Sequence, residues 1–233
     1  KINRDFKTLK YMVDNLKHSK IEILATNSCL KNCPMIFTHT TALSHASDKT
    51  KGKENYEDWS LFYCQKIQNE REEEYIKSPW VRPEDIKYYE DIGIEHFKLT
   101  EREFPTSELI KRVKAYTNRK YDGNLIDLIQ GHGCLDENGE KQLEKRKVKN
   151  KKEIYNEIKR VRGIGCSRKY PRNIYIDNSK LDGFIDFFVK GNCNNNCNEC
   201  GYCKNFAKKA VTKNLEVSNY LKELYDEYDK YKI

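Results

Sequence analysis

The sequence predicts an α/β fold built from the repeating unit of a β/α barrel, with a helical, cysteine-rich extension towards the C-terminus. Two observations predict the barrel unit. A helix-forming pattern leads directly into a short apolar strand that ends in a polar loop, and the same order recurs further along the chain. A dense run of cysteines between residues 193 and 203 marks the extension.

The first unit lies near the start of the sequence. Residues 4–18 carry an apolar stripe at helical spacing, and residues 21–25 follow as a short buried strand. The strand runs into a turn-rich loop at residues 26–29, and Pro34 permits a new helix. Barrel enzymes place their working groups in loops of this kind.

The second unit repeats this order. Residues 83–93 predict a helix, because acidic residues in its first turn match the helix dipole. Residues 94–99 predict the next strand, and residues 100–104 its terminal loop. A further helix is expected from residue 105, followed by a short apolar element at residues 124–129.

The composition changes at residues 131–152, which predict an exposed linker or insertion that includes a solvated basic run. We therefore expect a barrel segment at residues 1–130 and a cysteine-rich α/β extension at residues 153–233. Helices and one strand of the extension are expected at residues 153–161, 173–176 (the strand), 181–189, 204–211 and 217–228.

The chain is very polar for a globular protein, with 37% hydrophobic and 34% charged residues. Either its surface is heavily charged, or a segment that completes the core lies outside it. The net charge of +8 is compatible with a polyanionic partner such as nucleic acid. Lys is abundant throughout the chain, so charge alone is a weak signal.

The nine cysteines indicate the compartment. The sequence has no apolar run that could span a bilayer and no hydrophobic signal region near Lys1, so we expect no membrane association. An odd number of clustered cysteines fits reduced, metal-binding thiols in the cytoplasm better than disulfides. Because the sequence begins with Lys1 instead of Met, we expect it to be part of a longer chain.

The strongest motif is a run of four cysteines within eleven residues: Cys193, Cys197, Cys200 and Cys203. Gaps of three, two and two residues let the backbone wrap around one metal centre, and bacterial ferredoxins use the same gaps in the opposite order. The sequence therefore predicts an iron–sulfur cluster, most simply 4Fe–4S. Structural zinc is the alternative, although zinc sites usually pair two such knuckles across a longer spacer.

A second constellation consists of Cys29 and Cys33 in the loop after the first strand, with Cys64 further on. These thiols predict a second metal centre, since a loop after a strand is seldom fully buried. The alternative is that they are small buried hydrophobic residues. A fourth ligand would come from His39, His45, Cys134, Cys166 or a residue outside the sequence.

The sequence resembles the collagenase-like peptidase family U32 in the segments at residues 23–34, 78–85 and 93–102, which cover roughly half of the chain. The clearest segment runs from Gly93 to Arg102 and is similar to the family's Gly-Val/Ile-x-x-x-Lys-Ile-x-Gly-Arg pattern. Here Glu101 replaces the usual glycine. The four-cysteine run is not part of the best-known members.

The resemblance implies that residues 1–130 are the C-terminal half of a TIM-like β/α barrel, completed by a preceding half or a second chain. It also implies that Cys29, Cys33 and Cys64 are cluster ligands. Lys98 and Arg102 would lie at the mouth of a strand, where two cations can hold an anionic substrate. The alternative for both is a salt bridge to a nearby glutamate: Glu95, Glu101 or Glu103.

Three functions are compatible with these patterns. The first is an oxygen-independent hydroxylase or redox enzyme acting on an RNA base or a small anionic substrate, as several U32-like proteins are. The second is a peptidase, although the sequence has no Gly-x-Ser-x-Gly or His-Glu-x-x-His motif. The third is a non-catalytic, zinc-stabilised module that binds nucleic acid or protein.

Overall fold

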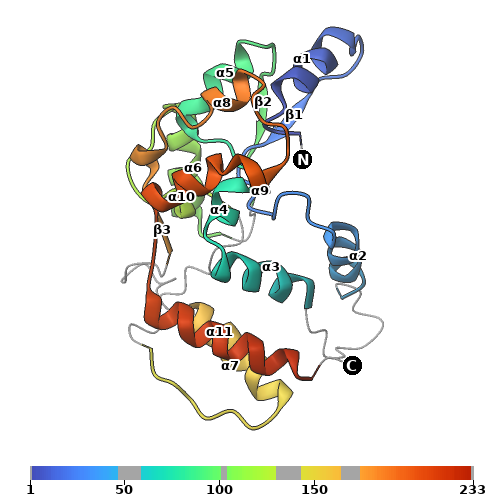
Figure 1. Cartoon of the computed structure of the whole chain (residues 1–233). Helices are drawn as coiled ribbons and strands as arrows, with labels where there is room; N and C mark the ends of the chain where they lie inside the picture. Colours follow the sequence, from blue (N-terminus) through green and yellow to red (C-terminus); the bar gives the residue numbers. More distant parts are fainter. Residues whose placement is uncertain (1, 47–58, 101–103, 130–142, 164–173, 232–233) are drawn as a thin grey trace.

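The computed structural model describes residues 2–46, 59–100, 104–129, 143–163 and 174–231. Within them the fold is a mixed α/β structure dominated by helices (Figure 1). The elements are α1 (Phe6–Asn15), β1 (Glu22–Leu24), α2 (Ile36–Ala46), α3 (Trp59–Glu70), α4 (Glu73–Lys77), η2 (Pro83–Asp85), α5 (Ile86–Glu90), β2 (His96–Lys98), α6 (Thr106–Thr117), η3 (Leu125–Asp127), α7 (Lys151–Gly163), β3 (Ile174–Ile176), η4 (Asn178–Leu181), α8 (Asp186–Val189), α9 (Cys197–Cys200), α10 (Tyr202–Ala210), β4 (Val211–Lys213) and α11 (Leu215–Asp229).

The two predicted barrel strands lie side by side. β1 pairs with β2 in parallel, with Ile23 opposite Phe97 and Leu24 opposite Lys98. A parallel pair joined by a helical connection is the arrangement expected of neighbouring barrel strands. The described residues contain this pair and a second two-stranded sheet, and they form no closed barrel. The mixed α/β class is thus confirmed, while the half-barrel remains a prediction.

The second sheet differs from the prediction. Residue 211 was expected to close a helix, but α10 ends at Ala210 and β4 begins at Val211. β4 pairs antiparallel with β3, with Ile176 opposite Val211. The backbone N–H and C=O groups of Val211 to Lys213 therefore find partners in a strand far away in sequence, which outweighs the local helical pattern.

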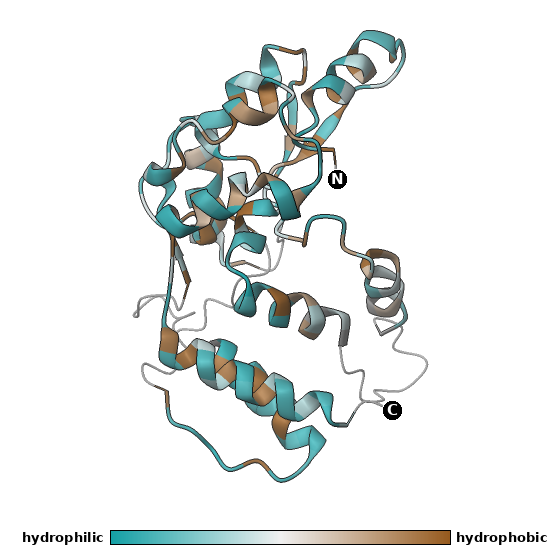
Figure 2. Ribbon diagram, in the orientation of Figure 1, coloured by the Kyte–Doolittle hydropathy of each residue, from teal (hydrophilic) through white to brown (hydrophobic). Residues whose placement is uncertain are grey.

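Two apolar clusters form the core. The larger one joins α1, β1 and residues 75–94 to η3, α8 and α10, with Leu9, Trp80 and Phe184 at most 1% exposed. The smaller one packs α7 and α11 against Phe62 of α3. Each cluster therefore contains residues from both sides of the expected linker at residues 131–152. Figure 2 shows hydrophobic and hydrophilic residues alternating along α11, as a helix with one buried face requires.

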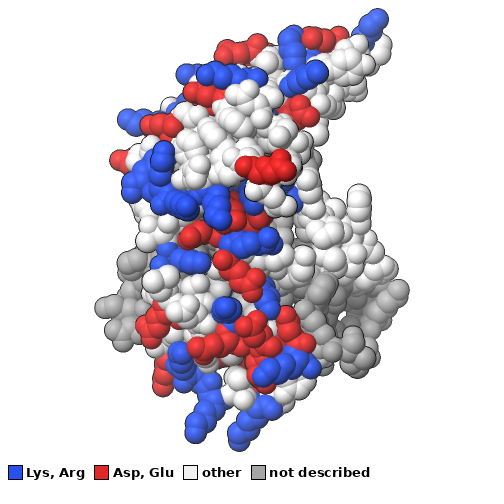
Figure 3. Space-filling model, in the orientation of Figure 1, with Lys and Arg blue, Asp and Glu red and all other residues white. Residues whose placement is uncertain are grey.

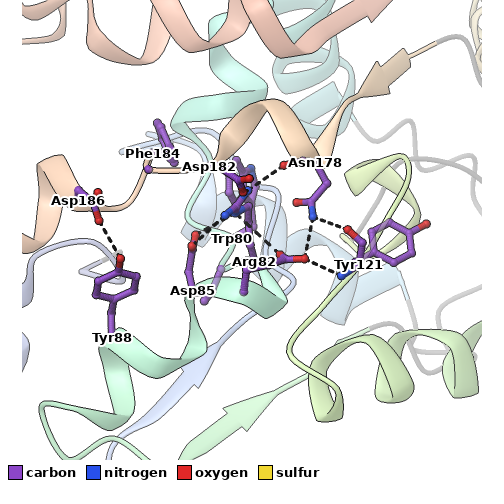
Figure 4. A network of polar contacts seen from close by, with 12 residues as sticks. Trp80, Arg82, Asp85, Tyr88, Tyr121, Asn178, Asp182, Phe184 and Asp186 are labelled. Carbon is purple, nitrogen blue, oxygen red and sulfur yellow. Dashed lines mark hydrogen bonds and ion pairs between the residues drawn. The ribbon is translucent and has the colours of Figure 1, made fainter.

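A polar network centred on the buried Arg82 joins η2 to η4 beside the larger cluster (Figure 4). The Arg82 guanidinium, only 3% exposed, forms two contacts of 3.2 Å with the Asp85 carboxylate. It also donates to the Asn178 carbonyl at 2.8 Å and to Asp182 at 3.1 Å. The Asn178 amide in turn donates to Glu84 at 3.0 Å. The network holds η4, and thus the chain leading to the four cysteines, against η2.

Candidate metal centre

The four cysteines of the run line one pocket of about 200 Å³. Its thiol-bearing residues are Cys193, Cys197, Cys200 and Cys203. Of these, Cys200 is exposed and the other three are half-buried. The four cysteines therefore share one pocket, and this pocket is accessible from the surface.

Local backbone geometry explains how eleven residues can turn all four thiols towards one space. Asn195 and Gly201 have positive φ values of 63° and 64°, so the chain reverses on either side of the short helix α9. The Asn194 side chain accepts from the Asn196 N–H at 3.0 Å, a local turn that asparagine favours. The Cys200 N–H donates to the Asn196 carbonyl at 3.0 Å and closes α9.

A lysine from a distant part of the chain reaches the sulfurs. The Lys31 Nζ lies 3.5 Å from Cys197 Sγ and 3.9 Å from Cys193 Sγ. Lys31 belongs to the loop after β1, between Cys29 and Cys33. The two predicted cysteine constellations are thus connected by this side chain, although they lie far apart in sequence.

The protonation of Cys203 depends on opposing influences. Burial raises the pKa of the Cys203 thiol, and the nearby Cys197 and Cys193 raise it further, whereas the charges of Arg4 and Lys31 lower it. The net pKa lies above its usual value. A metal centre would reverse this direction, because only the thiolate is a ligand and the metal supplies the compensating positive charge.

The lining of the pocket includes aromatic and cationic side chains. Phe187 and Tyr202, both in the lining, stack with ring centres 4.1 Å apart. Arg71, Lys77 and Lys204 also line the pocket. Figure 3 shows Lys and Arg side chains, interspersed with Asp and Glu side chains, over the face that carries α4 and α10.

The described residues include no group of three or more His, Cys, Asp or Glu side chains positioned to hold a single metal ion. The four thiols thus share a pocket without converging on one point. A zinc ion needs all its ligands about 2.3 Å away, whereas the ligands of an iron–sulfur cluster each bind a different iron. By donor type, four cysteine thiolates suit either a 4Fe–4S cluster or a structural zinc ion.

The other predicted cysteines lie elsewhere. Cys29 and Cys33 are half-buried in the loop after β1, and the Cys29 N–H donates to Asn27 Oδ1 at 2.8 Å. Cys64 lies on α3, where it is close enough to Tyr225 to influence that residue's pKa. None of these three lines the four-cysteine pocket. Whether they bind metal remains a prediction.

Among the suggested additional ligands, His39 and His45 lie on α2. Cys134 and Cys166 are outside the described residues, as is Arg102.

Lys98 ends β2, as the mouth of a barrel strand requires. Its ammonium lies 3.9 Å from Glu22 on the neighbouring strand, and both side chains are 57% exposed. The expected alternative partner Glu95 instead lies 3.9 Å from Lys20. An exposed pair at this distance is weak, so Lys98 keeps access to solvent and to a ligand.

Lys31 and Arg4 are the site residues that the sequence analysis missed. The Arg4 guanidinium lies 4.3 Å from the Trp80 ring centre and donates to the Ile76 carbonyl at 2.7 Å. Its charge is close enough to Cys203 to lower the pKa of that thiol. For Lys31, the signal in the sequence was its position between two cysteines. Nothing local indicated that it faces a different cysteine run.

These features define a mixed α/β protein with a surface pocket lined by four cysteine thiols. The chain is 29% identical over 210 residues to an uncharacterized protease of Methanocaldococcus jannaschii. The alignment covers 90% of this chain and 51% of the relative, so the chain spans about half the length of the curated protein it matches. The similarity supports a distant relationship to this protease.

No protein-family model matches the chain. No solved structure matches it either. Among the described residues, no helix combines the length and apolar character needed to cross a bilayer.

Proposed function

We propose that this chain is an iron–sulfur protein whose four-cysteine pocket holds a 4Fe–4S cluster. The observation that carries the proposal is the gathering of Cys193, Cys197, Cys200 and Cys203 in one accessible pocket. When bound, such a cluster supplies one-electron transfer. The residues of the chain would hold it, place aromatic rings beside it and offset its negative charge with cations.

We further propose that the complete protein is a U32-like redox enzyme or oxygen-independent hydroxylase. Its substrate would be an RNA base or a small anionic molecule, held by Lys98 and Arg102. The resemblance at residues 93–102 and the exposure of Lys98 at the end of β2 support this role. Cys29, Cys33 and Cys64 would hold a second cluster near that strand end.

Metal analysis tests the cluster directly. The protein is purified without oxygen, and iron, acid-labile sulfide and zinc are measured per chain. We expect about four iron and four sulfide per centre and little zinc. Stoichiometric zinc with no sulfide would contradict the proposal and favour the zinc-stabilised module.

Two matched variants localise the centre. Cys197→Ser should remove the iron of this pocket, because a hydroxyl is a poor substitute for a thiolate ligand. Asn198→Ala, the next residue in the same pocket lining, should retain it. A Cys64→Ser variant that loses iron independently would indicate the second centre. Equal iron in Cys197→Ser and the unsubstituted protein would refute the assignment.

A peptidase is the second candidate, because the relative in Methanocaldococcus jannaschii is named a protease. Cys29 or Cys64 would have to act as the nucleophile, with His39 or His45 as its base, since the sequence has none of the common serine or zinc peptidase motifs. Peptide cleavage that disappears in Cys29→Ala while the iron content is retained would support it. Absence of cleavage in iron-loaded protein would favour the redox function.

A further inference from the structure

Lys31 connects the loop after β1 to the four-cysteine pocket. Its ammonium is within hydrogen-bonding distance of two sulfurs, at 3.5 Å from Cys197 and 3.9 Å from Cys193. The side chain is half-buried, so its charge is less screened than that of a fully exposed lysine. These sulfurs lie 162 and 166 positions further along the chain.

We propose that Lys31 raises the reduction potential of the centre held in this pocket, by keeping a positive charge against the sulfurs of Cys193 and Cys197. The inference rests on the proposed function, since it concerns the same cysteines. It assigns Lys31 a positioning and tuning role, and it does not make Lys31 a ligand.

The physical reason is electrostatic. Reduction adds one electron to the centre and therefore one negative charge, while no bond is made or broken and no proton needs to move. A nearby ammonium stabilises the more negative, reduced state more than the oxidised state. Hydrogen bonds to the sulfurs act in the same direction, since they withdraw electron density from the ligands.

The other cations around the pocket are placed differently. Lys77 lies 2.9 Å from Glu74, which offsets its charge. Arg4 donates to the backbone carbonyls of Ile76 and Trp80. Lys204 lines the pocket and is exposed to solvent, so its charge is screened. Lys204 is therefore a suitable control, because it has the same chemistry and shares the pocket.

The test is a spectroscopically monitored redox titration of the anaerobically purified protein, with dithionite as the reductant. Lys31→Met preserves the length of the side chain and removes its charge. We expect the equilibrium constant for reduction to fall about tenfold, which lowers the one-electron potential by about 59 mV. Lys31→Arg should stay near the original potential, and Lys204→Met should change it by less than Lys31→Met does.

Iron and sulfide content separates the outcomes. If the unsubstituted protein contains no iron or sulfide, the proposed function fails. If Lys31→Met is fully loaded and keeps the original potential, the cluster stands and the role of Lys31 is refuted.

Lys31→Gln provides a second uncharged variant in case Lys31→Met loads poorly. If both variants fail to load while Lys31→Arg loads fully, Lys31 serves assembly of the centre, and the tuning role is overturned.

Discussion

The guanidinium of Arg82 donates a 2.8 Å hydrogen bond to the backbone carbonyl of Asn178, 96 positions further along the chain. The same guanidinium faces the Asp85 carboxylate, and the two side chains are only 3% and 5% exposed. This contact joins the part of the sequence expected to be a barrel segment to the part expected to be an extension. The two parts therefore depend on each other for stability.

Replacing Arg82 should be strongly destabilising. Arg82→Met leaves the buried Asp85 carboxylate without its charge partner and the Asn178 carbonyl without its donor. We expect a loss of about 3–5 kcal/mol in the free energy of unfolding, measured by urea denaturation. Asp182→Asn alters an exposed partner of the same guanidinium and should cost at most about 1 kcal/mol. Similar losses of unfolding free energy in Arg82→Met and Asp182→Asn would contradict the dominant role of the buried contacts of Arg82.

Glu157 of α7 should make stability depend on pH. Burial acts to raise the pKa of its carboxyl, but the hydrogen bond and charge of Arg160 and the Tyr220 hydroxyl outweigh burial, so the pKa lies below its usual value. The stabilisation is therefore present above the unfolded pKa of about 4.3 and is lost as the pH falls through the folded pKa.

The Glu157→Gln variant tests whether this stabilisation is lost in acid, as expected. At pH 7 the variant should be about 1–3 kcal/mol less stable than the unsubstituted protein, because charge-assisted hydrogen bonds to Arg160 are weakened. The difference should shrink as the pH falls below about 4. Thermal denaturation of both proteins across this range gives the comparison, and a difference that grows in acid would exclude the mechanism.

Two glycines with positive φ that follow short helices should respond differently to alanine. After α5, Gly93 has φ +93°, and an added Cβ would lie 3.0 Å from Val13 Cγ1. After α8, Gly191 has φ +70° with nothing within 4 Å. Gly191→Ala should cost about 1 kcal/mol through backbone conformation alone, and Gly93→Ala about 2–3 kcal/mol because a clash is added. Chemical denaturation measures both, and equal costs would exclude a clash with Val13.

Lys98 should matter little for stability. Its 3.9 Å contact with Glu22 is exposed on both sides. Lys98→Ala and Glu22→Ala should each change the free energy of unfolding by no more than about 0.5 kcal/mol. A loss above about 2 kcal/mol in Lys98→Ala would show that the lysine is structural and would remove the main reason to assign it to a substrate. Iron content should be the same in both variants.

Local patterns predicted much of the fold. The apolar stripe of α1 and the short runs of β1 and β2 were visible in the sequence, and the structure places these elements within the expected ranges. By contrast, α3 was not predicted. Its buried face includes Gln65, Gln68 and Asn69, so burial there does not follow hydrophobicity. Gln68 and Asn69 are held by backbone carbonyls of Ser28 and Ser218, contacts that no local pattern encodes.

The candidate site was predictable in its ligands but not in its surroundings. The spacing of Cys193 to Cys203 indicated four thiols around one space, because short gaps constrain the backbone. The approach of Lys31 to the thiols and the nearness of the Arg4 charge to Cys203 depend on how β1 and α1 meet α8 and α10. Such long-range packing leaves no periodic trace in the sequence.

No loop separates α10 from β4, since the helix ends at Ala210 and the strand starts at Val211. The pairing of Val211 with Ile176 therefore also fixes the rotation of α10 about its axis. Shifting the junction by one residue would turn that helix by about 100° and swing Cys203 out of the pocket. The antiparallel pairing of β3 with β4 therefore determines the direction of the Cys203 thiol, which lies two helical turns away.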